Sequence, residues 1–203
     1  VFINKKSGRS STSLDENILP AYKIALDDPD PRKLIILHLI GSHPNYKLRY
    51  PEQFSKFNDS SNDEVEKKLE RNEVNHLIQL KRNEYDNSIL YQDWIVAKLF
   101  DLLISTQSDF RSFTFLSDHG NEVGHAKNYA GHSANTEAGY RIPVIIWYDH
   151  MPSKGIRSEQ PIDASDLDRY VLHLMGAHDR LDRKEKLCWL DQTCNFIPHL
   201  LWR

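Results

Sequence analysis

The chain has 203 residues, of which 39% are hydrophobic and 27% are charged, and its formal net charge is -3 at pH 7. This length suits one domain with a sizeable core. No stretch approaches the roughly 18 consecutive apolar residues that suggest a membrane-spanning helix. Because the charge is nearly balanced, we expect no basic surface for phosphates and no nucleic-acid partner.

The N-terminal part of the sequence predicts a short helix and then a buried strand. The chain opens in a polar stretch and lacks the charged start and apolar run of a signal peptide. We therefore expect it to be a piece of a longer protein. Ser13 and Glu16 have capping-box spacing, so a helix should follow and end before the turn at 27–31. Residues 33–40 (KLIILHLI) are almost continuously apolar, which predicts a central strand buried on both faces of a parallel or mixed sheet.

The middle of the chain predicts an exposed excursion and a long helix. Residues 52–82 are strongly polar, which is typical of a surface excursion with an exposed helix. Apolar side chains at helical spacing over 85–103 predict an amphipathic helix packed against the sheet, with Asp86 and Asn87 expected to cap it.

Two further strands and a second helix complete the expected α/β order. We predict strands at 111–116 and 142–148, and a helix at 165–175 that ends at Gly176. Alternation of strands and helices indicates an α/β fold, and we expect a single domain over 1–203.

The residues after the strand at 111–116 are the most informative for chemistry. Ligands of open α/β sheets bind beyond the carboxyl ends of strands, where Ser117, Asp118, His119 and Gly120 stand. A carboxylate and an imidazole are suitable zinc ligands, although two ligands do not complete a tetrahedral site. Asp118 and His119 can reach one ion only if the chain turns there, and Gly120 makes such a turn easy. The simpler interpretation is that Asp118 caps a turn and His119 is a hydrogen-bonded loop histidine.

Other histidines follow predicted strands as well. His43 comes after the first strand, while His125 and His132 lie in the loop 117–141, which is longer than ordinary connections. These loops can bring the histidines to one end of the sheet.

Several segments resemble lipid A type phosphoethanolamine transferases of the sulfatase and alkaline phosphatase superfamily. They occur in that family's order, and their joint order is specific, although Ser-Asp-His-Gly alone recurs throughout the superfamily. The resemblance covers most of the chain and corresponds to the C-terminal part of the catalytic domain. The segments are 34–43 (LIILHLIGSH), 85–91 (YDNSILY), 115–120 (FLSDHG) and 140–147 (YRIPVIIW), with 15–20 (DENILP) and 167–176 (LDRYVLHLMG) beside them.

The resemblance implies roles for particular residues. Asp118 and His119 are expected to be zinc ligands, and His43 and His132 to contact the phosphoryl group or a second zinc. Asn121 stands where the family usually has glutamate, so the role of Glu122 stays open, and His125 is either functional or a solvent-exposed histidine.

The resemblance also implies a fold and an incomplete active site. The expected fold is a three-layer α/β/α sandwich around a central, mostly parallel sheet, incomplete at its N-terminal side. The family's nucleophilic threonine and its glutamate zinc ligand belong to a missing N-terminal half of the catalytic domain, so we expect the isolated chain to be inactive.

The implied reaction of the whole zinc enzyme is transfer of phosphoethanolamine from phosphatidylethanolamine to a sugar or phosphate of lipopolysaccharide. The parent protein would be anchored in the bacterial inner membrane with this domain in the periplasm. Cys188 and Cys194, which the residues alone leave as a disulfide or two free thiols, are then expected to be bonded. The alternatives are a sulfatase or phosphodiesterase that transfers to water, and a non-catalytic scaffold domain.

Overall fold

The computed structural model describes residues 12–58, 63–151, 163 and 166–176. It divides after Met151 into two units, which are described separately below. The expected pairing of Cys188 with Cys194 lies outside the described residues.

The first unit begins with the predicted short helix, here a 3₁₀ turn η1 (Asp15–Ile18) that continues as α1 (Leu19–Asp27). The expected cap is wrong in detail, because Ser13 accepts a hydrogen bond from the Asn17 side chain at 3.1 Å and η1 has no side-chain cap. The predicted turn is confirmed: Asp28 and Asp30 each accept a hydrogen bond from the backbone two residues later, at 2.8 and 3.1 Å.

Residues 33–40 are extended but form no strand, so the prediction of a central strand buried on both faces is wrong for this structure. Ile35, Leu37 and Leu39 pack against the core, whereas Leu34 and Ile36 are 54% and 81% exposed. The physical reason is the lack of a hydrogen-bonded neighbour, because the described strands pair only as β1 with β4 and β2 with β3. Alternate residues are covered, as in a strand with one buried face.

The long helix α3 (His76–Ile104) is confirmed and begins earlier than predicted. Its cap is Asn75, whose side chain accepts a hydrogen bond from the Leu77 amide at 2.8 Å. Asp86 and Asn87 therefore lie inside the helix and do not cap it. Asn87 is buried and accepts hydrogen bonds from the backbone amides of residues 56 and 57, a long-range role that local spacing cannot show.

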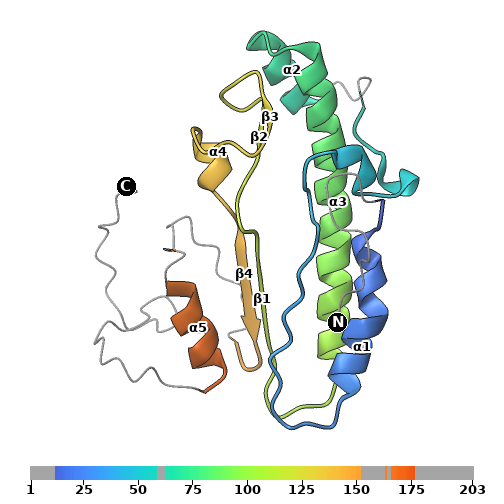
Figure 1. Ribbon diagram of the computed structural model, residues 1–203, viewed down its shortest axis with the longest axis vertical. Coiled ribbons are helices and arrows are strands. Elements are labelled where there is room, and N and C mark those ends of the chain that lie inside the picture. Colours follow the sequence, from blue (N-terminus) through green and yellow to red (C-terminus); the bar gives the residue numbers. More distant parts are fainter. Residues whose placement is uncertain (1–11, 59–62, 152–162, 164–165, 177–203) are drawn as a thin grey trace. The chain divides into compact units, whose positions relative to one another are not determined.

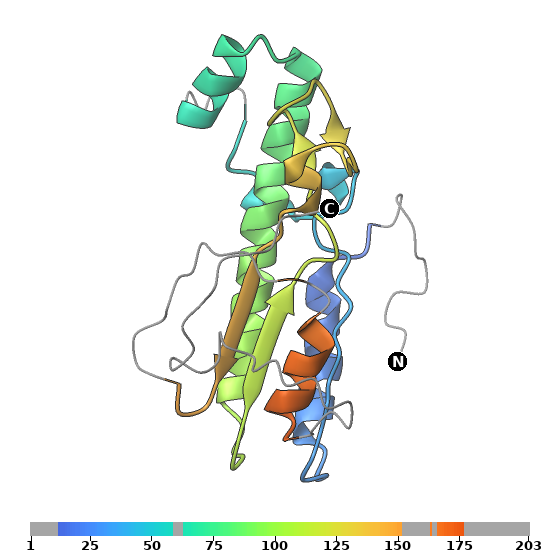
Figure 2. The ribbon, with the colours of Figure 1, turned by 90° about the vertical axis from the view of Figure 1, so that its left-hand side faces the viewer.

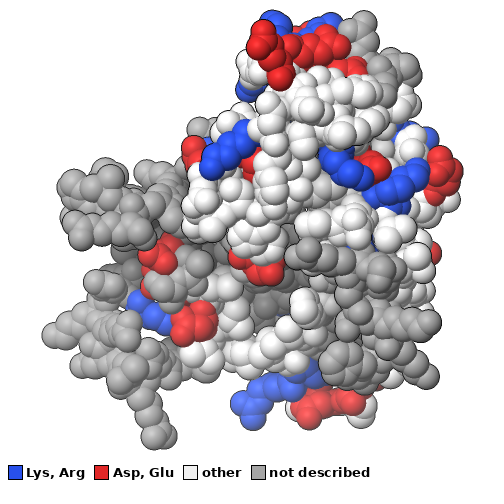
Figure 3. Space-filling model, turned by 45° about the horizontal axis from the view of Figure 1, so that its top comes forward, with Lys and Arg blue, Asp and Glu red and all other residues white. Residues whose placement is uncertain are grey.

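The polar excursion at 52–82 contains one 3₁₀ turn, one exposed helix and the start of α3. The turn η2 (Tyr46–Leu48) lies just before it, η3 (Glu52–Phe54) opens it and α2 (Glu64–Arg71) follows, while residues 76–82 belong to α3. Figure 3 shows acidic and basic side chains mixed over the end of the unit that carries α2, whose charged residues are Glu64, Glu66, Lys67, Lys68, Glu70 and Arg71. The solvent-facing character that the sequence predicted is confirmed for α2.

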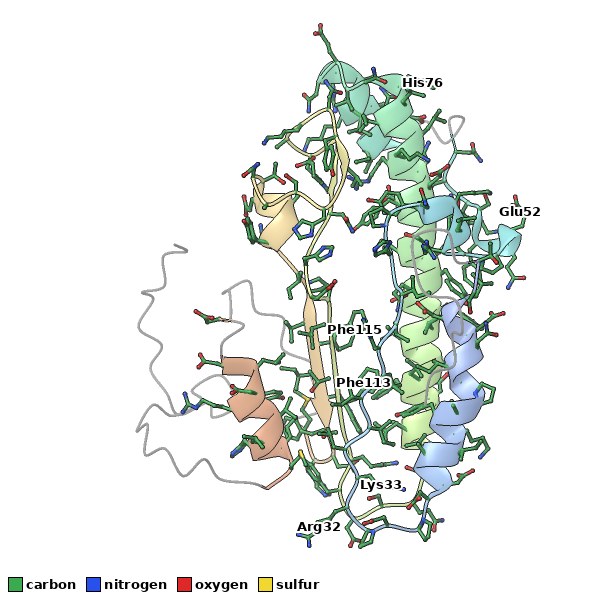
Figure 4. The ribbon with its side chains drawn as sticks, in the orientation of Figure 1. Arg32, Lys33, Glu52, His76, Phe113 and Phe115 are labelled. Carbon is green, nitrogen blue, oxygen red and sulfur yellow. The ribbon has the colours of Figure 1, made fainter. Side chains whose placement is uncertain are left out.

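Both later strands are confirmed as β1 (Ser112–Leu116) and β4 (Val144–Tyr148). They pair antiparallel, with Ser112 opposite Tyr148, and they run along α3 on the side away from α1 (Figures 1 and 2). Phe113 and Phe115 lie on the side of β1 that faces α3 (Figure 4). The described strands form only two-stranded antiparallel sheets, so the mostly parallel three-layer sandwich is not confirmed.

The predicted loop at 117–141 contains short regular elements. A hairpin pairs β2 (Glu122–Val123) with β3 (Ala130–Gly131), and the helical turn α4 (Glu137–Tyr140) follows. Strands of two residues leave no periodicity to detect, which is why the sequence predicted only a loop.

The core of the first unit forms around α3. Its buried members are Tyr22 and Tyr50 with the α3 residues Tyr91, Ile95 and Leu99. The Tyr91 hydroxyl accepts a hydrogen bond from the Glu16 amide at 3.1 Å, which satisfies the polar end of a buried aromatic ring. The contact fixes η1 against a helix 75 residues away in sequence.

In the second unit, the described residues form α5 (Leu167–Leu174), in agreement with the predicted helix. Gly176 ends it in the left-handed conformation, at φ +69°, and its amide donates to the His173 carbonyl at 2.9 Å. Among the helices that the structure describes in either unit, none combines the length and apolar character needed to cross a bilayer.

Candidate functional site

The chain turns immediately after β1, where Ser117, Asp118 and His119 follow the last paired residue, Leu116. The Ser117 hydroxyl donates to the His119 carbonyl at 2.7 Å, and the Asp118 carboxylate accepts from the His119 amide at 3.0 Å. These local bonds bend the backbone so that the neighbouring side chains no longer point to opposite faces. The turn required for a shared ion is therefore present.

A backbone contact fixes the tautomer of the His119 imidazole. Its Nδ1 lies 2.9 Å from the Gly120 carbonyl oxygen, which can only accept, so the proton is assigned to Nδ1 and the lone pair to Nε2. Nε2 lies 3.9 Å from Oδ2 of Asp118. Ligand atoms about 2.0–2.1 Å from one tetrahedral zinc are separated by roughly 3.3 Å, so a small side-chain rotation brings both atoms into range.

His132 lies directly against His119. The ring centroids are 3.9 Å apart and the ring planes are inclined by 41°. His132 follows β3, whereas His119 precedes β2, so the hairpin brings together two residues that are distant in sequence.

The segment that carries His43 is joined by a hydrogen bond to Asn121, which follows the Ser-Asp-His-Gly turn. The Asn121 side-chain amide donates to the Ser42 carbonyl at 3.3 Å. The buried Arg49 donates from Nε to the His43 carbonyl at 3.2 Å. The His43 ring donates from Nδ1 to the Pro44 carbonyl at 3.2 Å, which leaves Nε2 with a lone pair.

Position 120 requires glycine because the backbone of residues 138–141 packs against it, and not because its φ is positive. Its amide donates to the Gly139 carbonyl at 3.0 Å, and a Cβ at position 120 would collide with the carbonyl oxygen of Ala138. The left-handed glycines in the described ranges are 41, 124, 131 and 176. The expectation that Gly120 eases a turn is thus replaced by a steric reason for glycine.

His125 takes part in a structural network. Its Nε2 lies 3.0 Å from Arg82 Nη1, which can only donate, and Arg82 also donates from Nε to both oxygens of Asp86 at 2.9 Å. Burial and the Arg82 guanidinium lower the pKa of His125, so the ring is neutral near pH 7 and accepts from Arg82. The sequence left His125 as either functional or solvent-exposed, and in the structure its side chain is 43% exposed and bonded to Arg82.

The donor set fits part of a zinc site. Asp118 and His119 supply a carboxylate oxygen and an imidazole nitrogen facing one space. No cluster of three or more His, Cys, Asp or Glu side chains suited to a metal ion is found within the described ranges. A zinc ion held by these two residues would need further ligands to complete its coordination.

Sequence reasoning did not identify Arg82 or Thr136 as neighbours of this region and did not decide on Glu122. Glu122 is fully buried and Thr136 is 8% exposed. The one local sign that Glu122 could be buried is that it stands beside the apolar residue Val123 in an otherwise polar loop. Nothing local marks Arg82, which is 43 residues from its partner.

Comparisons with known proteins identify the family to which this chain is similar. Residues 3–177 match the sulfatase family. The phosphoethanolamine transferase EptC of Escherichia coli (strain K12) is 35% identical over 174 residues, which cover 83% of this chain and 28% of that protein. The phosphoethanolamine transferase EptA of Salmonella typhimurium is 34% identical over 173 residues, which cover 82% of this chain and 29% of that protein.

Solved structures show the same relationship. The C-terminal periplasmic domain of E. coli EptC, in complex with Zn, superposes with a TM-score of 0.62 at 34% identity, covering 72% of this chain and 40% of that one. The soluble domain of lipooligosaccharide phosphoethanolamine transferase A from Neisseria meningitidis gives a TM-score of 0.52 at 28% identity, covering 66% of this chain and 40% of that one.

The chain spans less than a third of the length of the curated relatives described above. The match to the family model nevertheless covers most of the chain, and it includes the Ser-Asp-His-Gly turn after β1. The chain therefore belongs to the sulfatase family, and the relatives that it resembles are phosphoethanolamine transferases.

Proposed function

We propose that this chain forms the C-terminal part of the catalytic domain of a zinc-dependent phosphoethanolamine transferase. The observation that carries the proposal is the arrangement after β1: Asp118 Oδ2 lies 3.9 Å from His119 Nε2, and the ring of His132 lies 3.9 Å from that of His119. The names of the relatives support the reaction class.

In this proposal Asp118 and His119 hold the zinc, while His43 and His132 serve the phosphoryl group. A zinc ion bound there would lower the pKa of a hydroxyl nucleophile and stabilise charge on the phosphoryl oxygens. Once Nε2 of His43 has taken up a proton, its imidazole, together with that of His132, would donate hydrogen bonds to those oxygens or a proton to the leaving group. The Nδ1 contact of His43 with a carbonyl directs its Nε2 away from its own backbone.

The nucleophile is placed outside this chain. Thr106 donates its hydroxyl to the Leu103 carbonyl at 2.7 Å, Thr114 lies within β1, and Thr136 is buried near Glu122. None of these three threonines occupies the turn with Asp118 and His119. The resemblance assigns the nucleophilic threonine and a glutamate ligand to the N-terminal half of the catalytic domain.

The same proposal includes substrates, location and the complete fold. Phosphatidylethanolamine is the donor, a sugar or phosphate of lipopolysaccharide is the acceptor, and the domain lies in the periplasm of a protein anchored in the inner membrane. The similarity to the periplasmic domain of E. coli EptC, whose structure was solved in complex with Zn, supports the location and the metal. Residues 33–39 join the central sheet of a three-layer sandwich when the rest of the domain is present.

Zinc titration of the 203-residue chain tests the site directly. Calorimetry should detect one zinc bound with modest affinity, because two ligands are in place and water completes the coordination. Asp118→Asn and His119→Ala should each weaken binding by about tenfold or more, because each removes a direct metal contact.

The matched control is His150→Asn. His150 is exposed and follows β4, at the end of the β1–β4 pair opposite to Asp118, since Ser112 pairs with Tyr148. Asparagine tolerates the positive φ of 68° at this position. Equal zinc binding by the wild-type chain, Asp118→Asn and His119→Ala would refute the site and favour a scaffold domain.

The reaction is tested on the whole protein with phosphatidylethanolamine vesicles. Diacylglycerol should be released beyond one molecule per enzyme only when lipopolysaccharide is added, and His119→Ala should abolish its release. Repeated turnover without any saccharide acceptor would instead assign the protein to the hydrolases that transfer to water.

A further inference from the structure

Two consecutive residues after the Ser-Asp-His-Gly turn are polar and buried. Asn121 is 8% exposed and Glu122 is fully buried. Burying a carboxylate is costly unless hydrogen bonds compensate for lost water, so a buried Glu122 has to be held by specific partners. Each of the two residues contacts a different segment that carries one of the histidines.

Glu122 fixes the hairpin that carries His132. Its Oε1 accepts a hydrogen bond from the Ala126 amide at 3.0 Å and a second from the His125 amide. The Thr136 hydroxyl, which follows His132 by four residues, lies close enough to influence the carboxylate, although it makes no hydrogen bond of ordinary geometry with Oε2. Glu122 therefore holds the turn that leads into β3, and its carboxylate lies near Thr136 beyond β3.

These contacts keep the buried carboxylate charged. Burial raises the pKa of Glu122, but the Ala126 amide, the Thr136 hydroxyl, the His125 amide and the His125 ring together lower it below its ordinary value. An ionised carboxylate is the stronger acceptor for backbone amides.

The hairpin is in turn anchored on α3. His125 accepts from Arg82, and Asn128 accepts from the Asn75 amide through its side-chain oxygen at 2.6 Å. A Cβ at Gly124 would press on Leu69, Val74 and Ile78, which shows how closely the hairpin approaches α2 and α3. The position of β3 is thus set by a rigid helix and by Glu122.

Asn121 contacts the opposite segment. Its amide donates to the carbonyl of Ser42, the residue before His43. Its Oδ1 is buried and accepts no hydrogen bond from any described residue. The Asn121 side chain therefore contacts the segment that carries His43 through its Nδ2 group, which donates the hydrogen bond.

We propose that Asn121 and Glu122 form a clamp of two positioning residues, in which Glu122 holds His132 against His119 and Asn121 holds the His43 segment beside them. The consequence for zinc and phosphoryl binding depends on the function proposed above. The arrangement of the histidines does not depend on it.

Magnetic resonance on the 203-residue chain with labelled histidine tests the clamp without metal. The wild-type chain should show a nuclear Overhauser effect between the ring protons of His119 and His132, whose rings are in contact. Glu122→Ala should abolish this signal and speed exchange of the His125 and Ala126 amides by about tenfold. Glu122→Gln should retain the signal, because an amide oxygen can still accept from both backbone amides.

The matched control is Glu137→Gln in the same loop, whose side chain is 82% exposed and should leave the signal unchanged. A folded Glu122→Ala chain that keeps the full signal would overturn the clamp, as would equal loss in Glu122→Ala and Glu122→Gln. If Glu122→Ala does not fold, Ala126→Pro decides: it removes a backbone amide from which Glu122 accepts, so it should weaken the signal in a folded chain, and an unchanged signal overturns the clamp.

Asn121 is tested in the same way through the His43 segment. Asn121→Ala should shift the resonances of Ser42 and His43 and leave the contact between His119 and His132 intact, because Glu122 is unchanged. Unchanged Ser42 and His43 resonances would overturn the role of Asn121.

Zinc binding separates this inference from the proposed function. Glu122→Ala should weaken zinc binding by about tenfold, as is usual when support of a metal site is removed. Loss of the ring contact with unchanged zinc affinity would leave the clamp standing and count against the proposed function. Loss of zinc binding with an intact ring contact would count against the clamp.

Discussion

The side chains of the candidate site are oriented largely by backbone groups. His119 and His43 each direct Nδ1 to a carbonyl oxygen, and Asp118 accepts from the amide of His119. Backbone carbonyls cannot donate, so these contacts assign the same tautomer to both rings and leave both Nε2 atoms with lone pairs. Both imidazoles therefore need no change of tautomer to bind a metal or a proton at Nε2.

At the same scale, the close packing around Gly120 leaves no room for a side chain. Gly120→Ala places a methyl group against the Ala138 carbonyl, and we expect it to lower the free energy of unfolding by about 1–3 kcal/mol. Because the adjacent His119 must shift to relieve the collision, zinc binding should weaken as well.

Thermal melting and zinc titration of the variant measure both effects. Gly139→Ala should behave similarly, since its Cβ would collide with the Ser133 carbonyl. Asn135→Ala, an exposed position in the same loop, is the control and should stay within about 0.5 kcal/mol of wild type. A fully stable Gly120→Ala chain with normal zinc binding would show that the loop is not closely packed.

At the scale of elements, the extended segment 33–39 has one covered and one open face. Leu37 packs on the core while Ile36 is 81% exposed. In the 203-residue chain, Leu37→Ala should therefore cost about 1–2 kcal/mol of unfolding free energy, and Ile36→Ala less than about 0.5 kcal/mol.

Denaturant unfolding of the two variants measures this difference in the free energy of unfolding. The proposed fold predicts a different result in the whole catalytic domain. In the whole catalytic domain Ile36→Ala should become as costly as Leu37→Ala, because a neighbouring strand and layer cover the open face. If Ile36→Ala stays harmless there, residues 33–39 are not part of the central sheet.

How far the sequence predicts the elements depends on their length and on where their partners lie. The apolar periodicity of 85–103 is long, and it correctly predicted α3, whereas the true start at His76 depends on a cap that lies in a polar stretch. The run 33–40 correctly indicated an extended chain, but pairing depends on a neighbour that the run itself does not contain.

The candidate site shows the same limit. Asp118 and His119 are adjacent in a recognisable motif, so sequence could nominate them together, and their approach to one space required only a local turn. The support from Glu122, Thr136 and Arg82 arises from contacts across the fold and from strands of two residues. Such contacts leave no spacing that a single sequence can reveal.

At the scale of the whole molecule, an ion pair joins the end of α3 to the sheet and makes stability depend on pH. Arg111 donates from Nε and Nη2 to the two oxygens of Asp149 at 2.9 Å, and from Nη1 to the carbonyls of Ile104 and Thr106 at 2.7 and 2.9 Å. The hydrogen bond from Arg111 lowers the pKa of Asp149 below its ordinary value of 3.8.

Because the folded-state pKa is lowered, the stabilisation is complete above the ordinary pKa and is lost as the pH falls through the folded-state value. Asp149→Asn should therefore melt at a lower temperature than wild type near pH 7, and the difference should shrink on acidification below about pH 4. Melting curves between about pH 2 and 7 measure this. A difference that is constant with pH would mean that the charge of Asp149 contributes nothing.

The extent of the chain relative to its relatives gives a final prediction. The isolated 203-residue chain should bind zinc but release no phosphoethanolamine from lipid, because the nucleophile is placed in the rest of the protein. Incubation with labelled phosphatidylethanolamine, beside the His119→Ala chain as background, measures this. Release above that background would mean that a hydroxyl within this chain is the nucleophile.

The central position of α3 also bears on how the polypeptide is made. This helix contacts α1, η1, η2 and η3, which precede it, and β1, β2 and β3, which follow it. On a ribosome adding about 5–20 residues per second, the segment from residue 58 to residue 104 takes roughly 2–9 s to appear. Until then the earlier segments lack the surface of α3 that covers them in the folded unit, so a chaperone that binds exposed apolar segments of the growing chain would be most useful before Ile104 has been made.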